Sequence, residues 1–215
     1  MSSRKSFRFL FSLVSLFLLL FLLVYFFTGE AKARQIQKGI ADEIIRFHVI
    51  ANGNTYDEQV LKYKVKDALV NELSPILEEA KSKGDALKII ESQINEIKLT
   101  AEKVVRENAS INTVSVSITN TYFPMKVYGS YTFPPGNYDA LQVKIGKAKG
   151  ENWWCVLFPP LCFVDETYSI VDEETGDQLQ YLLTDDEYHE LLSDKEIRIR
   201  YKIKLWELFK DWFFT

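Results

Sequence analysis

The sequence has few of the residues that bind metals or act as nucleophiles. It holds two cysteines and two histidines among 215 residues, and His48 and His189 lie far apart in the chain. A structural zinc site needs four such ligands, so no zinc site has an obvious source. The sequence also lacks the glycine pattern of a nucleophile elbow, an internal repeat and a low-complexity tract. These absences predict one domain that is not an enzyme and binds no metal or cofactor.

Basic residues are also in the minority. The chain has 26 basic and 30 acidic residues. Without residues 1–29, which hold three basic residues and no acidic one, the remainder has 23 basic and 30 acidic residues. Nucleic-acid binding depends on clustered lysine and arginine that neutralise the phosphates. The charge balance therefore argues against a nucleic-acid partner.

One long hydrophobic run stands near the amino end. Phe9–Phe27 contains no charged residue, and as a helix it would be roughly 28 Å long, close to the hydrocarbon thickness of a bilayer. Three basic residues precede it, which predicts that the amino end stays in the cytoplasm and the rest faces outward. The pattern at Ala31 and Ala33 is typical of a signal-peptidase site. We therefore predict that residues 1–29 are either a cleaved signal peptide or a membrane anchor. Residues 30–43 are predicted to be a linker, and residues 44–215 a single exported domain.

The exported part alternates between strand and helix patterns. Thr55 and Glu58 form a capping-box pattern that predicts a helix start, and Pro75 either kinks that helix or begins another. Strand patterns occur at Ile44–Ala51, Val114–Thr119, Leu141–Ile145, Trp153–Phe158 and Ile197–Leu205. We therefore predict an α+β fold of two layers, with helices on one face of a mixed β-sheet, preceded by an N-terminal membrane helix.

A second helix is predicted from about Asp85 to Asn108. Its apolar residues form one seam: Leu87, Ile90, Ile94, Ile97, Ala101 and Val104. The seam lasts under three heptads, which favours packing on the sheet over a coiled coil with a partner.

The stretch Asn152–Phe163, NWWCVLFPPLCF, concentrates aromatic residues, cysteines and prolines. As a strand, Trp153–Phe158 is apolar on both faces, which is typical of a central, doubly covered strand. Alternatives are an exposed surface that binds a partner and insertion into a membrane. We advance the hypothesis that Phe158–Phe163, the last part of this stretch, and the Phe123–Gly129 loop form part of a partner-binding surface. Its predicted members are Phe123, Tyr128, Phe158, Pro159, Pro160, Leu161 and Phe163.

The two cysteines, Cys155 and Cys162, lie in the same stretch. In an extended strand their Cα atoms would be roughly 20 Å apart, whereas a disulfide needs about 5.5 Å. A chain reversal at Pro159-Pro160 would bring them together. A disulfide and two buried thiols both remain open.

Several of these segments resemble the stage II sporulation protein R family of endospore-forming bacteria. The matching stretches are RFHVIAN (Arg46–Asn52), LKYKVKDALV (Leu61–Val70), FPMKVYG (Phe123–Gly129) and Pro134–Asp165, which includes the Trp-Trp-Cys to Leu-Cys-Phe segment. They occur in order over about 120 residues. At Gly53-Asn54 the sequence departs from the family pattern, and beyond Asp165 no specific resemblance is found.

The resemblance implies a signal and not a catalyst. Members of this family are made in the forespore and exported to the space between the two sporulation membranes. There they activate a membrane-embedded aspartic protease of the mother cell, which removes the pro-sequence of sigma-E. We therefore expect this chain to have that protease as its partner and to contact a membrane through residues 9–27.

Two other classes remain as alternatives. A cell-wall hydrolase would use a pair of carboxylates. A structural membrane-anchored scaffold would use the anchor, the seam of the second helix and the aromatic tail LWELFKDWFFT. His48 in a strand and His189 in an acidic run are expected to be a hydrogen-bonded structural residue and a solvated residue, respectively.

Overall fold

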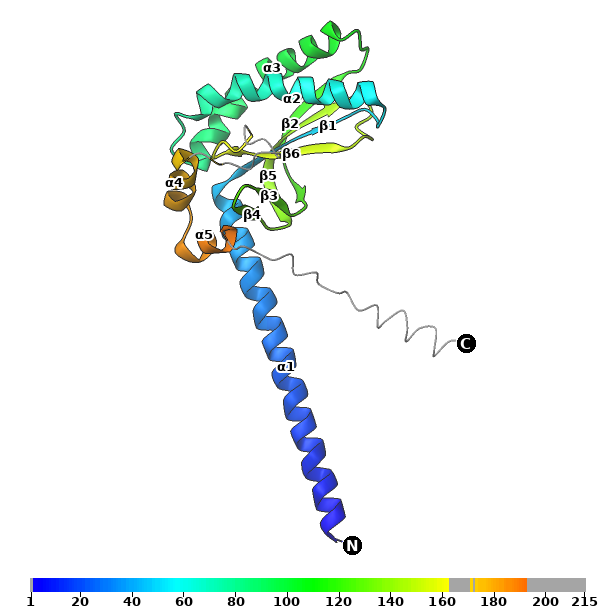
Figure 1. Ribbon diagram of the computed structural model, residues 1–215, viewed down its shortest axis with the longest axis vertical. Helices are drawn as coiled ribbons and strands as arrows, with labels where there is room; N and C mark the ends of the chain where they lie inside the picture. The colour runs from blue at the N-terminus through cyan, green and yellow to red at the C-terminus, as the bar shows by residue number, and fades with distance from the viewer. Residues whose placement is uncertain (1, 163–170, 172, 193–215) are drawn as a thin grey trace, which may run out of the picture.

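The computed structural model describes residues 2–162, 171 and 173–192. The hydrophobic run is part of one long helix, α1 (Ser2–Glu43), which projects away from the rest of the chain (Figure 1). By length and composition, its Phe9–Glu43 part is the one helix of the described chain that could cross a membrane. This confirms the predicted apolar N-terminal helix, of the kind that forms a membrane anchor or a signal sequence.

The expected linker at residues 30–43 is not a loose tether. It continues α1 without a break, and Ile40 and Ala41 near its end are buried in the core together with Ile44. The spacing of Ile36 and Ile40 places them on one side of the helix, and Ile44 directly after the helix packs into the same core. Residues 30–43 are therefore helical and ordered by a short apolar stripe among charged residues, and the division into linker and domain stays a prediction.

The main sheet has four described strands: β1 (Ile45–Ile50), β2 (Val114–Phe123), β5 (Gly136–Ile145) and β6 (Asn152–Phe158). Their order is β2-β5-β1-β6, with β1 parallel to β5 and the other two pairs antiparallel. This confirms the predicted mixed sheet. However, β6 lies at the edge of these four strands and not at the centre. Both faces of β6 are apolar because other parts of the chain pack on both faces of the sheet. They are not a sign that β6 has a neighbouring strand on each side.

Two helices cover one face of the sheet (Figure 1). The capping box of Thr55 and Glu58 starts α2 (Tyr56–Leu77), as predicted, and Pro75 lies within its last turn. In α3 (Lys83–Glu107), Ile90, Ile97 and Ala101 are fully buried. Leu87, Ile94 and Val104 are partly buried against the same core. The α+β fold with helices packed on one face is thereby confirmed.

The opposite face carries a small hairpin, β3 (Lys126–Tyr128) and β4 (Tyr131–Phe133), which forms a separate two-stranded sheet (Figure 1). Two short helices follow, α4 (Glu173–Leu182) and α5 (Asp185–Leu191), and α5 lies beside α1 (Figure 1). The predicted strand Ile197–Leu205, the aromatic tail and Phe163 lie outside the described residues.

Candidate partner-binding site

The residues predicted to contact a partner are mostly inside the protein. Phe123, Phe158 and Leu161 have no exposed surface, and 4% of Tyr128 is exposed. Pro159 is buried as well, and Pro160 is partly buried. While the hairpin lies closed, buried side chains cannot contact a partner, so the hypothesis is corrected in this arrangement for Phe123, Tyr128, Phe158, Pro159 and Leu161. They build the core under the surface.

The chain reverses direction directly after β6. The Phe158–Pro159 peptide bond is cis, and the Leu161 N–H donates to the Val156 carbonyl at 3.0 Å. Cys155 and Cys162 are joined by a disulfide, with their Cα atoms 5.2 Å apart. Of the two states left open by the sequence, the structure has the disulfide. The reversal returns Leu161 to the core instead of leading it outward along the sheet edge.

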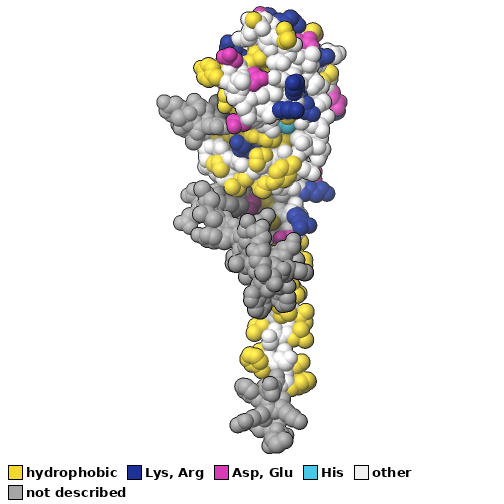
Figure 2. Space-filling model, turned by 90° about the vertical axis from the view of Figure 1, so that its right-hand side faces the viewer, with side chains coloured by type: hydrophobic (Ala, Val, Ile, Leu, Met, Phe, Trp, Pro, Cys, Tyr) yellow, Lys and Arg dark blue, Asp and Glu magenta, His cyan; other side chains and the backbone are white. Residues whose placement is uncertain are grey.

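The segment from the end of β2 through β3 exposes different apolar side chains from those predicted. Phe123 and Tyr128 point inward, while Tyr122, Met125 and Val127 are 60%, 50% and 57% exposed. Side chains alternate along an extended chain, so each inward ring leaves an outward neighbour. We call Tyr122, Met125 and Val127 the hairpin patch. On the face of the molecule drawn in Figure 2, hydrophobic side chains gather across the domain below a group of lysine and arginine side chains.

Under the hairpin, Arg46 of β1 is completely buried among aromatic rings. Its Cζ atom lies 4.7 to 5.8 Å from the ring centroids of Phe123, Tyr128, Phe133 and Tyr138. Such cation–π contacts stabilise a guanidinium that has lost water. Its Nη2 also donates to the Tyr128 hydroxyl at 3.5 Å. Burial lowers the pKa of Arg46, and the nearby Tyr128 and Tyr138 partly offset this shift.

His48 lies two residues along the same face of β1. Its ring stacks on Trp154 at a centroid distance of 4.9 Å and packs on Phe123 at 5.2 Å. Its Nε2 atom is 2.8 Å from Nε2 of Gln142. Burial, followed by Lys144 and Arg46, lowers the pKa of His48 from 6.5 to about 4. The imidazole is therefore neutral at pH 7 and serves the packing of this face, whereas His189 is exposed on α5.

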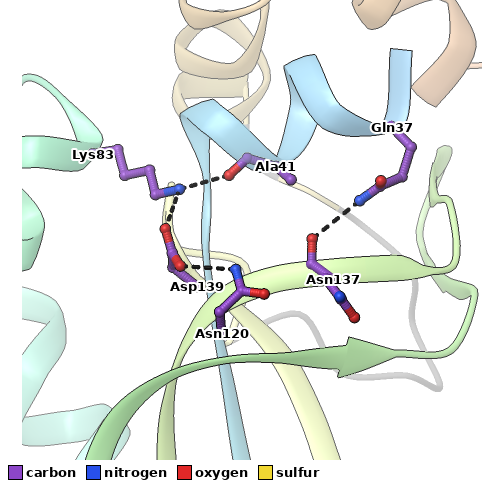
Figure 3. A network of polar contacts seen from close by, with 6 residues as sticks. All are labelled: Gln37, Ala41, Lys83, Asn120, Asn137 and Asp139. Atoms are coloured by element: carbon purple, nitrogen blue, oxygen red, sulfur yellow. Dashed lines mark hydrogen bonds and ion pairs between the residues drawn. The ribbon is translucent and has the colours of Figure 1, made fainter. Parts of the chain in front are cut away.

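A polar network fixes the end of α1 to the domain (Figure 3). The Lys83 ammonium donates to the Ala41 carbonyl at 2.6 Å and pairs with Asp139 at 2.8 Å. Asn120 donates to the same carboxylate at 3.0 Å. These bonds from Asn120 and Lys83 lower the pKa of Asp139. Gln37 adds a bond to the Asn137 carbonyl at 3.2 Å, so α1 has a fixed direction relative to the sheet.

An open hollow lies between the start of α2 and the end of α3, and its walls include Asp57, Glu58 and Lys64. The Glu58 carboxylate accepts from the Thr55 N–H and hydroxyl and from Asn52. These hydrogen bonds lower its pKa. A glycosidase acid needs a raised pKa, so the chemistry of Glu58 suits the helix cap. Among residues 2–162, 171 and 173–192, no group of three His, Cys, Asp or Glu is arranged to hold a metal ion.

An apolar N-terminal helix joined firmly to a two-layer α+β domain with an exposed hairpin thus defines the class of protein. The family model described as Stage II sporulation protein R matches residues 41–168. Stage II sporulation protein R of Bacillus subtilis (strain 168) is 36% identical over 143 residues. The chain belongs to the stage II sporulation protein R family.

The aligned part covers 64% of this chain and 64% of that relative, which is less than two thirds of the relative's length. No solved structure matches the chain. The family sets the chain among sporulation proteins.

Reasoning from the sequence missed Arg46 and Tyr122. Within the predicted Phe123–Gly129 loop, it named Phe123 and Tyr128 as contacts and not Met125 and Val127. The sequence could have indicated Arg46, because a charged residue within a largely apolar strand pattern is unusual. Met125 and Val127 could have been found from their alternation with Phe123 and Tyr128. The prediction chose the larger aromatic residues as the contacts, but large aromatic residues are the ones that a small second core recruits.

Proposed function

We propose that this chain is an exported signal that activates a membrane-embedded aspartic protease and so leads to the processing of pro-sigma-E. Membership of the stage II sporulation protein R family supports a role in sporulation. The N-terminal apolar helix supports delivery to or across a membrane. In this proposal the protein is made in the forespore, faces the space between the two sporulation membranes and acts by binding.

The hairpin patch is the observation that carries the binding role. Tyr122, Met125 and Val127 lie within six consecutive residues and are each at least half exposed. Their inward neighbours Phe123 and Tyr128 pack around Arg46, so the backbone beneath the patch is ordered while the hairpin is closed. Apolar side chains that are exposed on an ordered backbone lose little conformational entropy on binding. They are typical of protein-binding surfaces.

The experiment replaces the patch and leaves the core intact. In sporulating cells, the double variant Met125→Ser, Val127→Ser should reduce processing of pro-sigma-E about tenfold or more, because loss of a contact residue costs on the order of 1 to 2 kcal/mol. The melting temperature of the purified chain should stay unchanged, since both side chains are exposed. Ile111→Ser is the matched control, because Ile111 is fully exposed and precedes the opposite end of β2.

Normal processing in the double variant would contradict the patch as the contact surface. A fall in processing accompanied by an equal fall in melting temperature would return these residues to a structural role. The hydrolase alternative is tested separately by incubating the purified chain with peptidoglycan. Release of soluble fragments that is lost on Glu58→Gln would favour an enzyme over a signal.

A further inference from the structure

Buried polar atoms without a hydrogen-bond partner gather on one face of the sheet. In the described part of the chain they are Nε and Nη1 of Arg46, Nδ1 of His48 and Oδ1 of Asn152. Arg46 and His48 alternate with Phe47 along β1, and Asn152 pairs with Ile50, so all of them lie on the face opposite α2 and α3. Buried polar groups are nearly always hydrogen-bonded, and a cluster that is not calls for an explanation.

The unpartnered atoms of Arg46 and His48 are donors. Gln142 Nε2 can only donate, so His48 Nε2 accepts, and the proton of the neutral ring lies on Nδ1. Arg46 adds the N–H groups of Nε and Nη1. The four rings around Arg46 stabilise its positive charge, but the N–H groups of Nε and Nη1 at the edge of the guanidinium still have no acceptor. Both side chains contact Phe123 and therefore belong to one small region.

We infer that Arg46 and His48 form a binding site for a carboxylate, supplied by an acidic side chain of the partner protein, and that the β3–β4 hairpin is the flap over this site. A carboxylate accepts two parallel hydrogen bonds from a guanidinium and cancels its single charge. A phosphate dianion would leave excess negative charge in a buried region, which is strongly unfavourable. The identity of the partner, but not the site, rests on the proposed function.

The hairpin is suited to act as a flap because it belongs to its own sheet and has no ladder to the four main strands. The Tyr128 hydroxyl donates to the Trp154 carbonyl at 3.0 Å, which is one side-chain bond from the hairpin to β6. A two-stranded hairpin alone is only marginally stable. It can therefore open without disturbing the main sheet. The same hairpin carries Val127, and Met125 precedes it directly, so a partner seated on the hairpin patch contacts the flap itself.

The test uses the full chain in detergent micelles, labelled with 15N-arginine, and acetate as the carboxylate probe. Acetate is titrated against chloride at constant ionic strength, and the Nε–H resonance of Arg46 is followed by NMR after assignment with Arg46→Lys. Acetate should shift this resonance saturably and slow its exchange with water, whereas chloride should not. Arg34 and Arg106 are exposed controls and should show no saturable shift.

Absence of an acetate-specific shift would overturn the carboxylate site and leave Arg46 as a structural residue. The variant Tyr128→Phe tests the flap, because it keeps the ring beside Arg46 and removes the hydroxyl that donates to Trp154 and accepts from Arg46 Nη2. It should lower the acetate concentration at half-saturation at least threefold, and an unchanged value would overturn the flap. The titration does not involve the protease. A positive titration together with normal processing in the hairpin-patch variant would therefore contradict the proposed function and keep the site.

Discussion

Single residues on β1 show how alternation distributes chemistry between two cores. Phe47 points toward the helices and packs edge-on against Trp153, while Arg46 and His48 point toward the hairpin. The helix side is a mostly aliphatic core around this aromatic pair. The hairpin side is a second, aromatic core built around one cation. A one-residue register slip would exchange these two environments, which specifies the register of β1 strongly.

The depressed pKa of His48 predicts an acid-dependent loss of stability. The pKa of His48 is about 4 in the folded chain and 6.5 for an ordinary histidine, so between these values the unfolded chain binds a proton that the folded chain does not bind. The contribution of His48 is fully present above pH 6.5 and is lost as the pH falls toward 4. By pH 4.5 the unfolding free energy should have dropped by roughly 2 to 3 kcal/mol from this group.

Denaturant unfolding at pH 7 and pH 4.5, compared with the variant His48→Phe, measures this effect. Phenylalanine keeps an aromatic ring against Trp154 but does not titrate. The variant should be less stable at pH 7 and should lose less stability on acidification, while the contributions of the carboxylates stay common to both proteins. Equal losses in the two proteins would show that His48 is not held neutral.

Among the elements, α3 shows that a periodic pattern predicts which face of a helix is buried but not how deeply each residue of that face is buried. Its seam was predicted as one row, but Ile97 is fully buried and Ile94 only partly. Replacing Ile97 by Ala should destabilise the fold by about 2 to 5 kcal/mol. Ile94→Ala should cost about half as much, because less of its surface is removed from water. Equal effects, measured by denaturant unfolding, would contradict the position of α3 on the sheet.

The junction of α1, α3 and β5 depends on Lys83. Its side chain is 12% exposed, pairs with Asp139 and donates to the Ala41 carbonyl. Replacement by Met leaves both acceptors with fewer partners and should cost about 1 to 3 kcal/mol of unfolding free energy. Lys88→Met is the matched control on the same helix, because Lys88 is 79% exposed and pairs with Asp85 at the surface. It should change stability by less than about 0.5 kcal/mol. Similar losses in the two variants would show that the junction does not depend on Lys83.

Local patterns predicted most of the elements. A few neighbouring residues are enough to define the capping box at Thr55, the alternation of β2 and the seam of α3. The errors arose where distant contacts decide. The edge position of β6 depends on the order of strands, and the burial of Leu161 depends on a chain reversal. The helical state of residues 30–43 depends on packing against the domain.

On the scale of the whole molecule, α1 is a stiff extension of the domain (Figure 1). Gln37 and Ala41 hold its last turns on the sheet side, and Lys32 pairs with Asp186 of α5 at 3.4 Å. Cleavage after Ala33 would remove Lys32 and keep the bonds of Gln37 and Ala41. The fold is therefore compatible with either an anchored or a released domain, and the division at residues 29 and 43 stays a prediction.

The central claim is that the domain contacts a membrane-embedded protease through the hairpin patch. Site-specific photo-crosslinking in sporulating cells tests it most directly, with a benzoylphenylalanine at Val127 and, as a control, at Ile111. The two positions flank opposite ends of the ten-residue strand β2, which is about 30 Å long. The account predicts an adduct with the sporulation protease, identified by mass spectrometry, from position 127 and not from position 111. An adduct from Ile111 alone, or none from Val127 while processing proceeds normally, would contradict it.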